Sequence, residues 1–258
     1  DDEFNDEFFY NLSVGFDEES CLVSHMDFVE SIRMFNENYA YRGSMSKTMR
    51  DHFANVSRDL KALLPATPKV LEIGSNDGVF LVNWDKGSTI AVEPCGNFAK
   101  ETNEMGYNTY NGFWDTEMSH KIGSAYGYMN LVFAANCMCH IPDLDETFQA
   151  VHNVLSPNGT FVFEDPSLSE MVKLNSYDQI YDEHPHIFSV TALKNILERN
   201  GLYIVRVEHL GVHGGSNRIF VKKDGSLADG TVESSLRFEE SLGINKIGRM
   251  QSFAGDVV

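Results

Sequence analysis

The sequence predicts an α/β fold in which helices cover both faces of a mostly parallel β-sheet and an antiparallel strand closes one edge. Short apolar runs alternate with segments of helical period between residues 46 and 200, which is the pattern of strand-helix-strand units. A glycine-containing turn at residues 74–78 follows the first of these strands. Two late strands, 202–208 and 217–222, are separated by a short glycine-rich loop, which favours a hairpin at the sheet edge.

Composition limits the class of protein. The 258 residues are 42% hydrophobic and 22% charged, which is ordinary for a globular chain with a substantial core. The net charge of -18 argues against binding nucleic acid, because a grip on phosphates needs clustered Lys and Arg. No apolar run approaches the roughly 20 residues that span a bilayer, and the first residues have no basic, signal-like character. We therefore predict a cytoplasmic protein without a membrane or nucleic-acid partner.

The elements follow in order along the chain. Residues 1–44 are predicted to be an acidic arm, 45–225 the main domain and 226–258 a helical extension. Residues 46–64 carry apolar side chains at helical spacing and stop at Pro65, so we expect an amphipathic helix beside the first strand. After it we expect strands at 69–73, 89–93, 107–110, 129–135, 159–164, 202–208 and 217–222, and helices at 77–84, 96–105, 143–155 and 189–200.

The turn after the first strand predicts a cofactor site. Gly74 and Gly78 permit positive φ and close approach of a ligand, but the spacing fits neither the dinucleotide fingerprint nor the phosphate loop. Glu72 lies where it can serve an amino-acid tail, and Glu93, at the end of the second strand, can accept from ribose hydroxyls. S-adenosylmethionine, with S-adenosylhomocysteine as its product, has both groups. The alternative is a turn that uses glycine for its geometry only.

The four cysteines, Cys21, Cys95, Cys137 and Cys139, form no CxxC pair and no regular framework. We therefore expect neither disulfides nor a metal site, and we interpret Cys137 and Cys139 as buried free thiols.

The stretch 177–186 is rich in titratable side chains and lies between a predicted strand and helix. Loops at the carboxyl edge of such a sheet commonly carry catalytic groups. His184 can hold or release a proton near neutral pH, since its ordinary pKa is about 6.5. The alternative is a loop histidine held by hydrogen bonds. Two further loops, 139–142 and 213–215, are expected to converge on the same edge.

Several motifs together resemble the sugar C-methyltransferases that act on nucleotide-linked deoxy-4-ketosugars. The likeness runs from about residue 35 to 222. The motifs are Glu72-Ile-Gly-Ser-Asn-Asp-Gly78, Ala134-Ala-Asn136-x-x-Cys-His140-Ile-Pro142, Glu164-Asp-Pro166, Tyr177-Asp-Gln-Ile-Tyr-Asp-Glu-His184 and His213-Gly-Gly215, with Tyr39-Ala-Tyr41-Arg-x-Ser44 and Met49-Arg-Asp-His-Phe53 upstream. The resemblance implies a class I, Rossmann-type methyltransferase fold and a small-molecule ketosugar substrate.

Two departures from this family shape the expected domain organisation. Its members usually begin with a cysteine-rich zinc module, whereas the corresponding region here offers only Cys21. They also usually continue into a second α/β domain that helps to hold the nucleotide-sugar. We expect this chain to lack both modules, with residues 1–44 as the remnant of the first.

The resemblance also assigns roles to the catalytic residues. C-methylation beside a ketone requires a base for the α-proton and donors for the enolate oxygen. It implies His184 as the base, Glu183 as its orienting neighbour, Tyr181 and Tyr39 as donors, and His140 as a second donor or acid.

The other site residues are assigned in two groups. The cofactor-binding residues are expected to be Glu72, Gly74, Asn76, Asp77, Gly78, Glu93, Pro94, Phe113 and Asn136, with Trp114 as an alternative to Phe113 against the adenine. The substrate-binding residues are expected to be Tyr41, His213, Gly215 and Arg218. Ordinary core packing of the aromatic residues, and a sheet-edge role for Arg218, are the alternatives.

Two other functions stay open from the sequence. The same cofactor could methylate oxygen or nitrogen of another small molecule. The chain could instead be an inactive methyltransferase-like subunit with a binding or structural role in an assembly.

Overall fold

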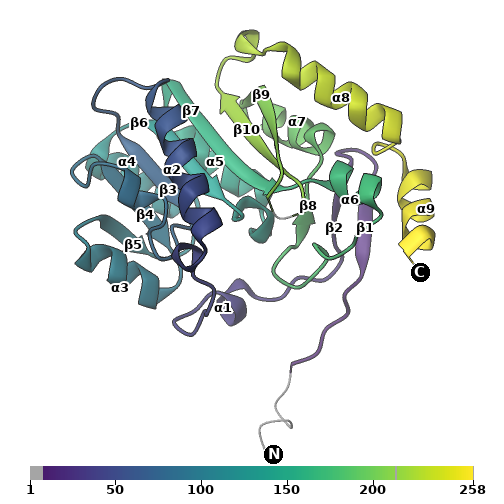
Figure 1. Ribbon diagram of the computed structural model, residues 1–258, viewed down its shortest axis with the longest axis horizontal. Helices are drawn as coiled ribbons and strands as arrows, with labels where there is room; N and C mark the ends of the chain where they lie inside the picture. The colour runs from purple at the N-terminus through teal and green to yellow at the C-terminus, as the bar shows by residue number, and fades with distance from the viewer. Residues whose placement is uncertain (1–7, 213, 258) are drawn as a thin grey trace, which may run out of the picture.

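A mixed seven-stranded sheet forms the centre of the molecule in this computed structural model, which describes residues 8–212 and 214–257 (Figure 1). Its strand order is β5-β4-β3-β6-β7-β10-β9. The strands are β3 (Val70–Ile73), β4 (Thr89–Glu93), β5 (Asn108–Asn111), β6 (Met129–Ala135), β7 (Leu155–Pro166), β9 (Tyr203–Leu210) and β10 (Ser216–Lys222).

Pairing within the sheet confirms the predicted topology. Strands β5, β4, β3, β6 and β7 are parallel, so the turns after β3, β4 and β6 lie at one edge. Strand β10 runs antiparallel to both β7 and β9, which is the hairpin expected at the end of the sheet. The fold is therefore the class I methyltransferase-like α/β sheet that the sequence predicted.

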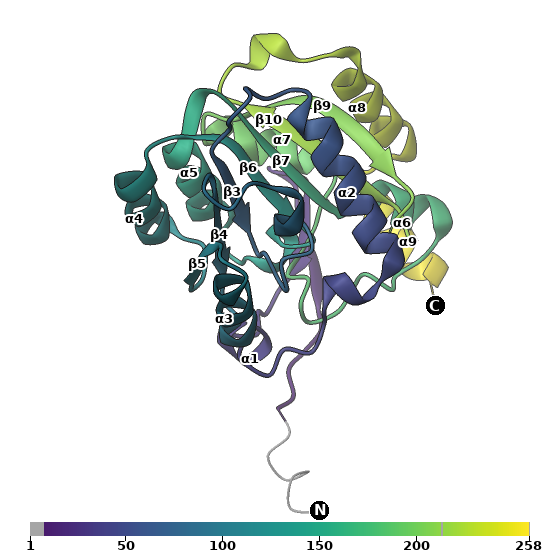
Figure 2. The same cartoon turned by 60° about the vertical axis from the view of Figure 1, so that its left-hand side comes forward.

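One face of the sheet is covered by α2 (Lys47–Lys61), which crosses it in Figures 1 and 2. The helix begins where the Ser46 hydroxyl accepts a hydrogen bond from Met49 N at 3.3 Å. Its apolar stripe, which includes Phe53 and Val56, packs on Phe80 and Phe133 in a ring cluster. The predicted amphipathic helix is confirmed.

The opposite face buries the largest core cluster, to which α5 (Leu144–Val154) and α7 (Val190–Arg199) contribute. Helix α4 (Thr116–Tyr126) packs against α5 and adds Ile122 to that core, and the sequence had not predicted it. The sequence contains both capping residues of this helix. Asp115 accepts from Met118 N at 2.7 Å at its start, and Gly127 ends it. Helix α3 (Gly96–Glu104) lies beside β4 and β5, as expected.

The helix predicted at 77–84 is wrong. Only a short 3-10 helix, η3 (Leu81–Asn83), forms there. Gly78 has φ +82°, a left-handed conformation that an α-helix does not contain. The Asn83 amide then donates to the carbonyls of Val79 and Phe80, both at 3.2 Å, in competition with a regular helical ladder.

The prediction of an irregular N-terminal arm is wrong for residues 14–25. Strands β1 (Val14–Asp17) and β2 (Leu22–His25) form a hairpin, and β2 pairs with β8 (His186–Ile187) in a second, three-stranded sheet. The acidic residues 17–19 supply its exposed turn, in which the Asp17 carboxylate accepts from Ser20 N at 3.1 Å. Residues 1–7 lie outside the described part of the chain. After β2 come the short helices α1 (Ser31–Met34) and η2 (Gly43–Met45).

A smaller core joins the second sheet to the C-terminal helices. It contains Val23 and Ile187 together with Met171 of α6 (Leu168–Leu174), a helix that the sequence analysis missed. Ile244 and Phe253 complete it. The expected helical character after residue 230 is confirmed by α8 (Gly230–Leu242) and α9 (Ile247–Val257). Among the described residues, no helix combines the length and the apolar character needed to cross a bilayer.

His186 links the second sheet to the turn that precedes α5. Its ring is 5% exposed, and its Nε2 lies 3.0 Å from the Pro142 carbonyl. Burial lowers the pKa of His186 to about 4. The unfolded chain therefore binds a proton at this histidine at a higher pH than the folded chain does. The unfolding free energy is highest above about pH 6.5, where the ring is neutral in both states, and it falls as pH drops toward the folded pKa.

We expect His186→Phe to weaken the acid sensitivity of folding. Between about pH 7 and pH 4.5, the wild type should lose about 2 to 3 kcal/mol more unfolding free energy than this variant. Denaturant unfolding at both pH values measures the difference, with the exposed His120→Gln as control. Equal pH dependence of His186→Phe and wild type would contradict the assignment.

Candidate functional site

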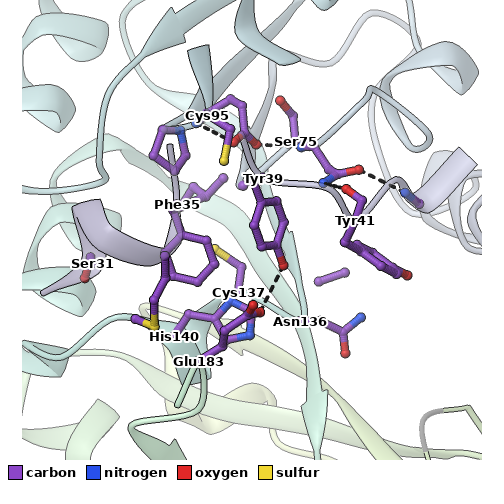
Figure 3. Close-up of a pocket in the computed structure, with 18 of the residues that line it drawn as sticks. Ser31, Phe35, Tyr39, Tyr41, Ser75, Cys95, Asn136, Cys137, His140 and Glu183 are labelled. Atoms are coloured by element: carbon purple, nitrogen blue, oxygen red, sulfur yellow. Dashed lines mark hydrogen bonds between the residues drawn. The ribbon is translucent and has the colours of Figure 1, made fainter. Parts of the chain in front are cut away.

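A cavity of about 740 Å³ opens at the carboxyl edge of the parallel strands. This volume is within the roughly 300 to 1,000 Å³ range of small-molecule sites. Its walls are the turns after β3, β4 and β6, the segment between β2 and α2, and the loop between α6 and β8. Figure 3 shows the side chains from these segments pointing toward a common space. Sequence segments that are far apart therefore meet in one site.

The turn after β3 approaches the turn after β6 very closely. Gly74 has φ +71°, and a Cβ atom there would lie 2.6 Å from the Cys137 Sγ. Only glycine therefore fits between the two turns without a shift. Gly78 also has positive φ, but a Cβ there would face Thr102 of α3, so this glycine serves the turn and does not line the cavity.

Glu93 closes the turn after β4. One carboxylate oxygen accepts from Asn76 N at 2.6 Å and the other from Cys95 N at 2.8 Å. Burial raises the pKa of Glu93, and these two backbone donors oppose the rise by stabilising the carboxylate. The residue is 3% exposed and lines the cavity, so its remaining lone pairs are available to hydroxyl groups of a ligand.

Glu72 provides a direct test of whether the site fits a ligand with a cationic amino-acid tail. Its side chain is buried and lines the cavity, and its Oε2 has no hydrogen-bond partner among the described residues. Burial raises the pKa of Glu72 well above its usual value, and the nearby carboxylates of Glu93 and Asp77 add to the effect. An ammonium group would satisfy this oxygen and offset the repulsion. The residues present fit S-adenosylmethionine.

The aromatic candidates for the adenine divide clearly. Phe113 lines the cavity and is 38% exposed, so its ring has a free surface. Trp114 also borders the cavity, but it is buried in the main core, where its Nε1 donates to the Thr147 carbonyl at 3.2 Å. Of the two, Phe113 has the more accessible ring.

His184 is held by its own loop. Its Nδ1 lies 2.9 Å from the Gln179 carbonyl oxygen, and its Nε2 lies 3.0 Å from the Tyr181 hydroxyl. Because a carbonyl only accepts, Nδ1 carries a hydrogen, and in the neutral ring Nε2 accepts from Tyr181. The loop backbone thereby selects the tautomer whose basic atom is Nε2. The ring is 3% exposed and lines the cavity.

A second contact crosses the cavity. The Tyr39 hydroxyl donates to Glu183 Oε2 at 2.9 Å, and Figure 3 shows the tyrosine reaching over to this carboxylate. Burial raises the pKa of Tyr39, and the adjacent Glu183 charge raises it further. The same two causes, in the same order, raise the pKa of Tyr181. Both phenols therefore stay protonated at neutral pH and can donate hydrogen bonds.

His140 lies between two rings. Phe35 stacks on one face with centroids 5.2 Å apart, and His184 lies against it at 5.0 Å. Burial lowers the pKa of His140 to about 3, with His184 contributing, so the ring is neutral at physiological pH. Of the two roles predicted for His140, donor or acid, the neutral state favours the hydrogen-bond donor.

Cys139, His140 and His184 present ligand atoms within 4.8 Å of one another, the kind of cluster that could hold a metal ion. However, the two imidazole planes are only 27° apart and stacked. A metal ion binds a histidine nitrogen in the plane of its ring, and stacked planes cannot both contain one ion. The arrangement fits proton chemistry better than metal binding.

The structure brings most of the predicted site residues to the cavity. The predicted residues that line it are Tyr39, Tyr41, Glu72, Gly74, Asn76, Glu93, Pro94, Phe113, Asn136, His140, Tyr181, Glu183 and His184. Asp77, Gly78, Gly215 and Arg218 do not line it. His213, a predicted substrate residue, lies outside the described residues.

Arg218 is occupied elsewhere. Its guanidinium donates to Glu164 and to Glu208, each at 2.7 Å, and the side chain is buried. His52 Nε2 lies 2.6 Å from the other Glu164 oxygen. Burial alone would raise the pKa of Glu164, but its bonds to His52 and its pairing with Arg218 lower it. This network joins α2 to β7, β9 and β10, so the expected pairing of Arg218 with a substrate anion does not fit its position.

Sequence reasoning missed several lining residues. Phe35, Ser75, Cys137 and Gln179 line the cavity, and Gln179 acts through its backbone carbonyl. Cys137 is half-buried there, in contrast to the expected buried thiol, while Cys139 is buried as predicted, and all four cysteines are free. Phe35 lies in the segment interpreted as an arm. Its aromatic character in an acidic stretch is the signal that could have identified it.

Comparison with known proteins agrees with this geometry. The family model described as a methyltransferase domain matches residues 41–207. C-methyltransferase NovU of Streptomyces niveus is 35% identical over 153 residues, which cover 58% of this chain and 36% of NovU. The chain therefore spans much less than the full length of this relative.

Two solved structures share the fold. The PH0226 protein of Pyrococcus horikoshii is 15% identical, with a TM-score of 0.51 over 76% of this chain and 99% of that chain. A Haloferax volcanii structure with the Trm112 methyltransferase activator gives 12% identity and a TM-score of 0.52, over 69% of this chain and 93% of that chain. The family model, supported by the fold and by the carboxylates of the cavity, leads to one conclusion: the chain belongs to the methyltransferase domain family, and its cofactor is S-adenosylmethionine.

Proposed function

We propose that this domain transfers a methyl group to a carbon beside a ketone, with His184 as the base that forms the enolate. The proposed acceptor is a nucleotide-linked deoxy-ketosugar. The name of NovU as a C-methyltransferase supports the reaction type. The sequence resemblance to enzymes that act on ketosugars supports the acceptor class.

The observation that carries the proposal is the tautomer of His184. Its Nδ1 is committed to the Gln179 carbonyl, so Nε2 is the basic atom, and it lies in the wall of the cavity that also contains the cofactor turn. A carbon acid beside a ketone needs such a base, because the neutral carbon does not attack a methyl group. Methyl transfer to a neutral amine makes no such demand, because its lone pair is already nucleophilic, whereas transfer to a hydroxyl can also use a base.

The tyrosines supply the second requirement. An enolate places negative charge on oxygen, and donors already fixed in a dry cavity stabilise it. The Tyr181 hydroxyl, 3.0 Å from Nε2, can donate instead to the carbonyl oxygen of the acceptor. Tyr39 approaches from the opposite wall; its single O–H, now donated to Glu183, would likewise have to turn to the acceptor oxygen. His140 is stacked on His184, and burial together with His184 keeps it neutral, so the base has no permanent positive charge beside it.

The cofactor half of the site has a separate task. S-adenosylmethionine supplies an electrophilic methyl group when it is bound. Glu93 would hold the ribose hydroxyls, Glu72 the ammonium group, and Phe113 the adenine, while Gly74 allows the ligand to approach the backbone. Asn136, with φ +49° directly after β6, and Tyr41 would line the space between cofactor and acceptor. Positioning of the two reactants should contribute much of the rate.

Replacing Glu93 by Gln should weaken cofactor binding by at least about tenfold, because a charged acceptor and one of two fixed backbone contacts are lost. Calorimetric titration with S-adenosylmethionine measures the dissociation constant. The circular dichroism of the variant must match that of the wild type. Glu101→Gln is the matched control, since Glu101 pairs with Arg42 at the surface of the neighbouring helix. An unchanged dissociation constant for Glu93→Gln would contradict the assigned role.

Replacing His184 by Ala should lower methyl transfer by at least about 10²-fold, the usual contribution of a general base, while cofactor affinity changes less than about threefold. The assay uses a nucleoside-diphosphate 4-keto-6-deoxyhexose and detects the added methyl group by mass. His120→Ala, an exposed histidine on α4, is the control. A parallel loss of transfer and of cofactor affinity in His184→Ala would rule out the role as a base.

A further inference from the structure

A segment between β2 and α2, residues 31–45, forms one wall of the cavity and carries Tyr39; we call it the strap. Two hydrogen bonds join its backbone to the Asn76 side chain of the cofactor turn. The Asn76 Oδ1 accepts from Gly43 N at 2.9 Å, and the Asn76 Nδ2 donates to the Tyr41 carbonyl at 2.9 Å. One carboxamide therefore satisfies both a donor and an acceptor of the strap backbone.

The contact between strap and turn is also sterically close. Gly43 is buried, and a Cβ atom there would lie 3.0 Å from Val79 Cγ1. The next amide, Ser44 N, donates to the Asp77 carboxylate at 3.1 Å. The side-chain polar atoms of Asn76 and Asp77 are thus hydrogen-bonded to the strap backbone. Asp77 does not line the cavity.

Asn76 also connects to the ribose side of the site. Its backbone N–H donates to Glu93 at 2.6 Å, and its φ is +47°. The strap in turn presents Tyr39, whose hydroxyl is bonded to Glu183 one residue from His184. Hydrogen bonds therefore link the cofactor acid to Asn76 and Asn76 to the strap backbone, and the strap in turn places Tyr39 against the loop that contains His184.

We infer that Asn76 is a positioning residue: its carboxamide fixes the strap so that Tyr39 reaches Glu183 and the acceptor, and it does not bind the cofactor. This inference rests on the proposed function for the role of Tyr39. It reassigns both Asn76 and Asp77, which the sequence analysis had placed among the cofactor ligands.

Two variants separate these roles. Asn76→Gly removes both strap bonds and keeps a residue that tolerates positive φ, whereas Asn76→Asp keeps the acceptor for Gly43 N and loses the donor to the Tyr41 carbonyl. Met45→Ala is the matched control on the same strap. The Met45 side chain is 77% exposed, so its removal should leave the bonds between strap and turn unchanged.

The first readout needs no turnover. Hydrogen exchange, followed by mass spectrometry, should be at least about tenfold faster for the amides of residues 39–45 in Asn76→Gly, and intermediate in Asn76→Asp. Calorimetry should give an S-adenosylmethionine affinity within about threefold of wild type in both variants. The Met45→Ala protein should match wild type in exchange and in affinity.

The second readout is coupling to Tyr39. Methyl-transfer rates are measured with the nucleoside-diphosphate ketosugar probe. The double variant Asn76→Gly with Tyr39→Phe should be at most about twofold slower than the slower of the two single variants, because both substitutions remove the same contribution of Tyr39. A cofactor affinity at least about tenfold weaker in Asn76→Gly, or unchanged strap exchange, overturns the inference. If no protein methylates the probe, the proposed acceptor fails, and exchange and affinity still decide the role of Asn76.

Discussion

The carboxylate of Glu93 is the interaction on which the site depends. By accepting backbone hydrogen bonds from Asn76 and Cys95, it joins the turn after β3 to the turn after β4. The Asn76 side chain is hydrogen-bonded to the strap, and Tyr39 of the strap is hydrogen-bonded to Glu183, beside His184. A buried carboxylate is costly unless it is hydrogen-bonded, so the residue that is suited to the ribose also imposes one geometry on the surrounding backbone.

The sequence predicted the sheet well because buried parallel strands are short apolar runs with little ambiguity. It failed where tertiary contacts decide the local structure. Positive φ at Gly78 and the side-chain bonds of Asn83 suppress the helix expected at 77–84. The hairpin at 14–25 is stabilised by pairing with β8, more than 150 residues later, which no local pattern reveals.

In the site, too, the sequence predicted some residues and missed contacts that only the folded chain decides. Residue type and spacing predicted that Glu72, Glu93 and His184 meet, and all three line the cavity, the two glutamates from strand ends and His184 from the loop before β8. Spacing could not show that Asp77 and Arg218 already have partners, which depends on the strap and on Glu164. It could not show that Phe35 stacks on His140 either, since the two rings meet only after the strap folds across the sheet edge.

The account depends most on the claim that His184 removes a proton from carbon. The direct measurement is deuterium uptake at the α-carbon of the nucleoside-diphosphate ketosugar in heavy water, with S-adenosylhomocysteine in place of the methyl donor. Exchange by the wild type and none by His184→Ala is the predicted result. Methyl transfer to the probe without any exchange at carbon, or exchange that persists in His184→Ala, would contradict the account.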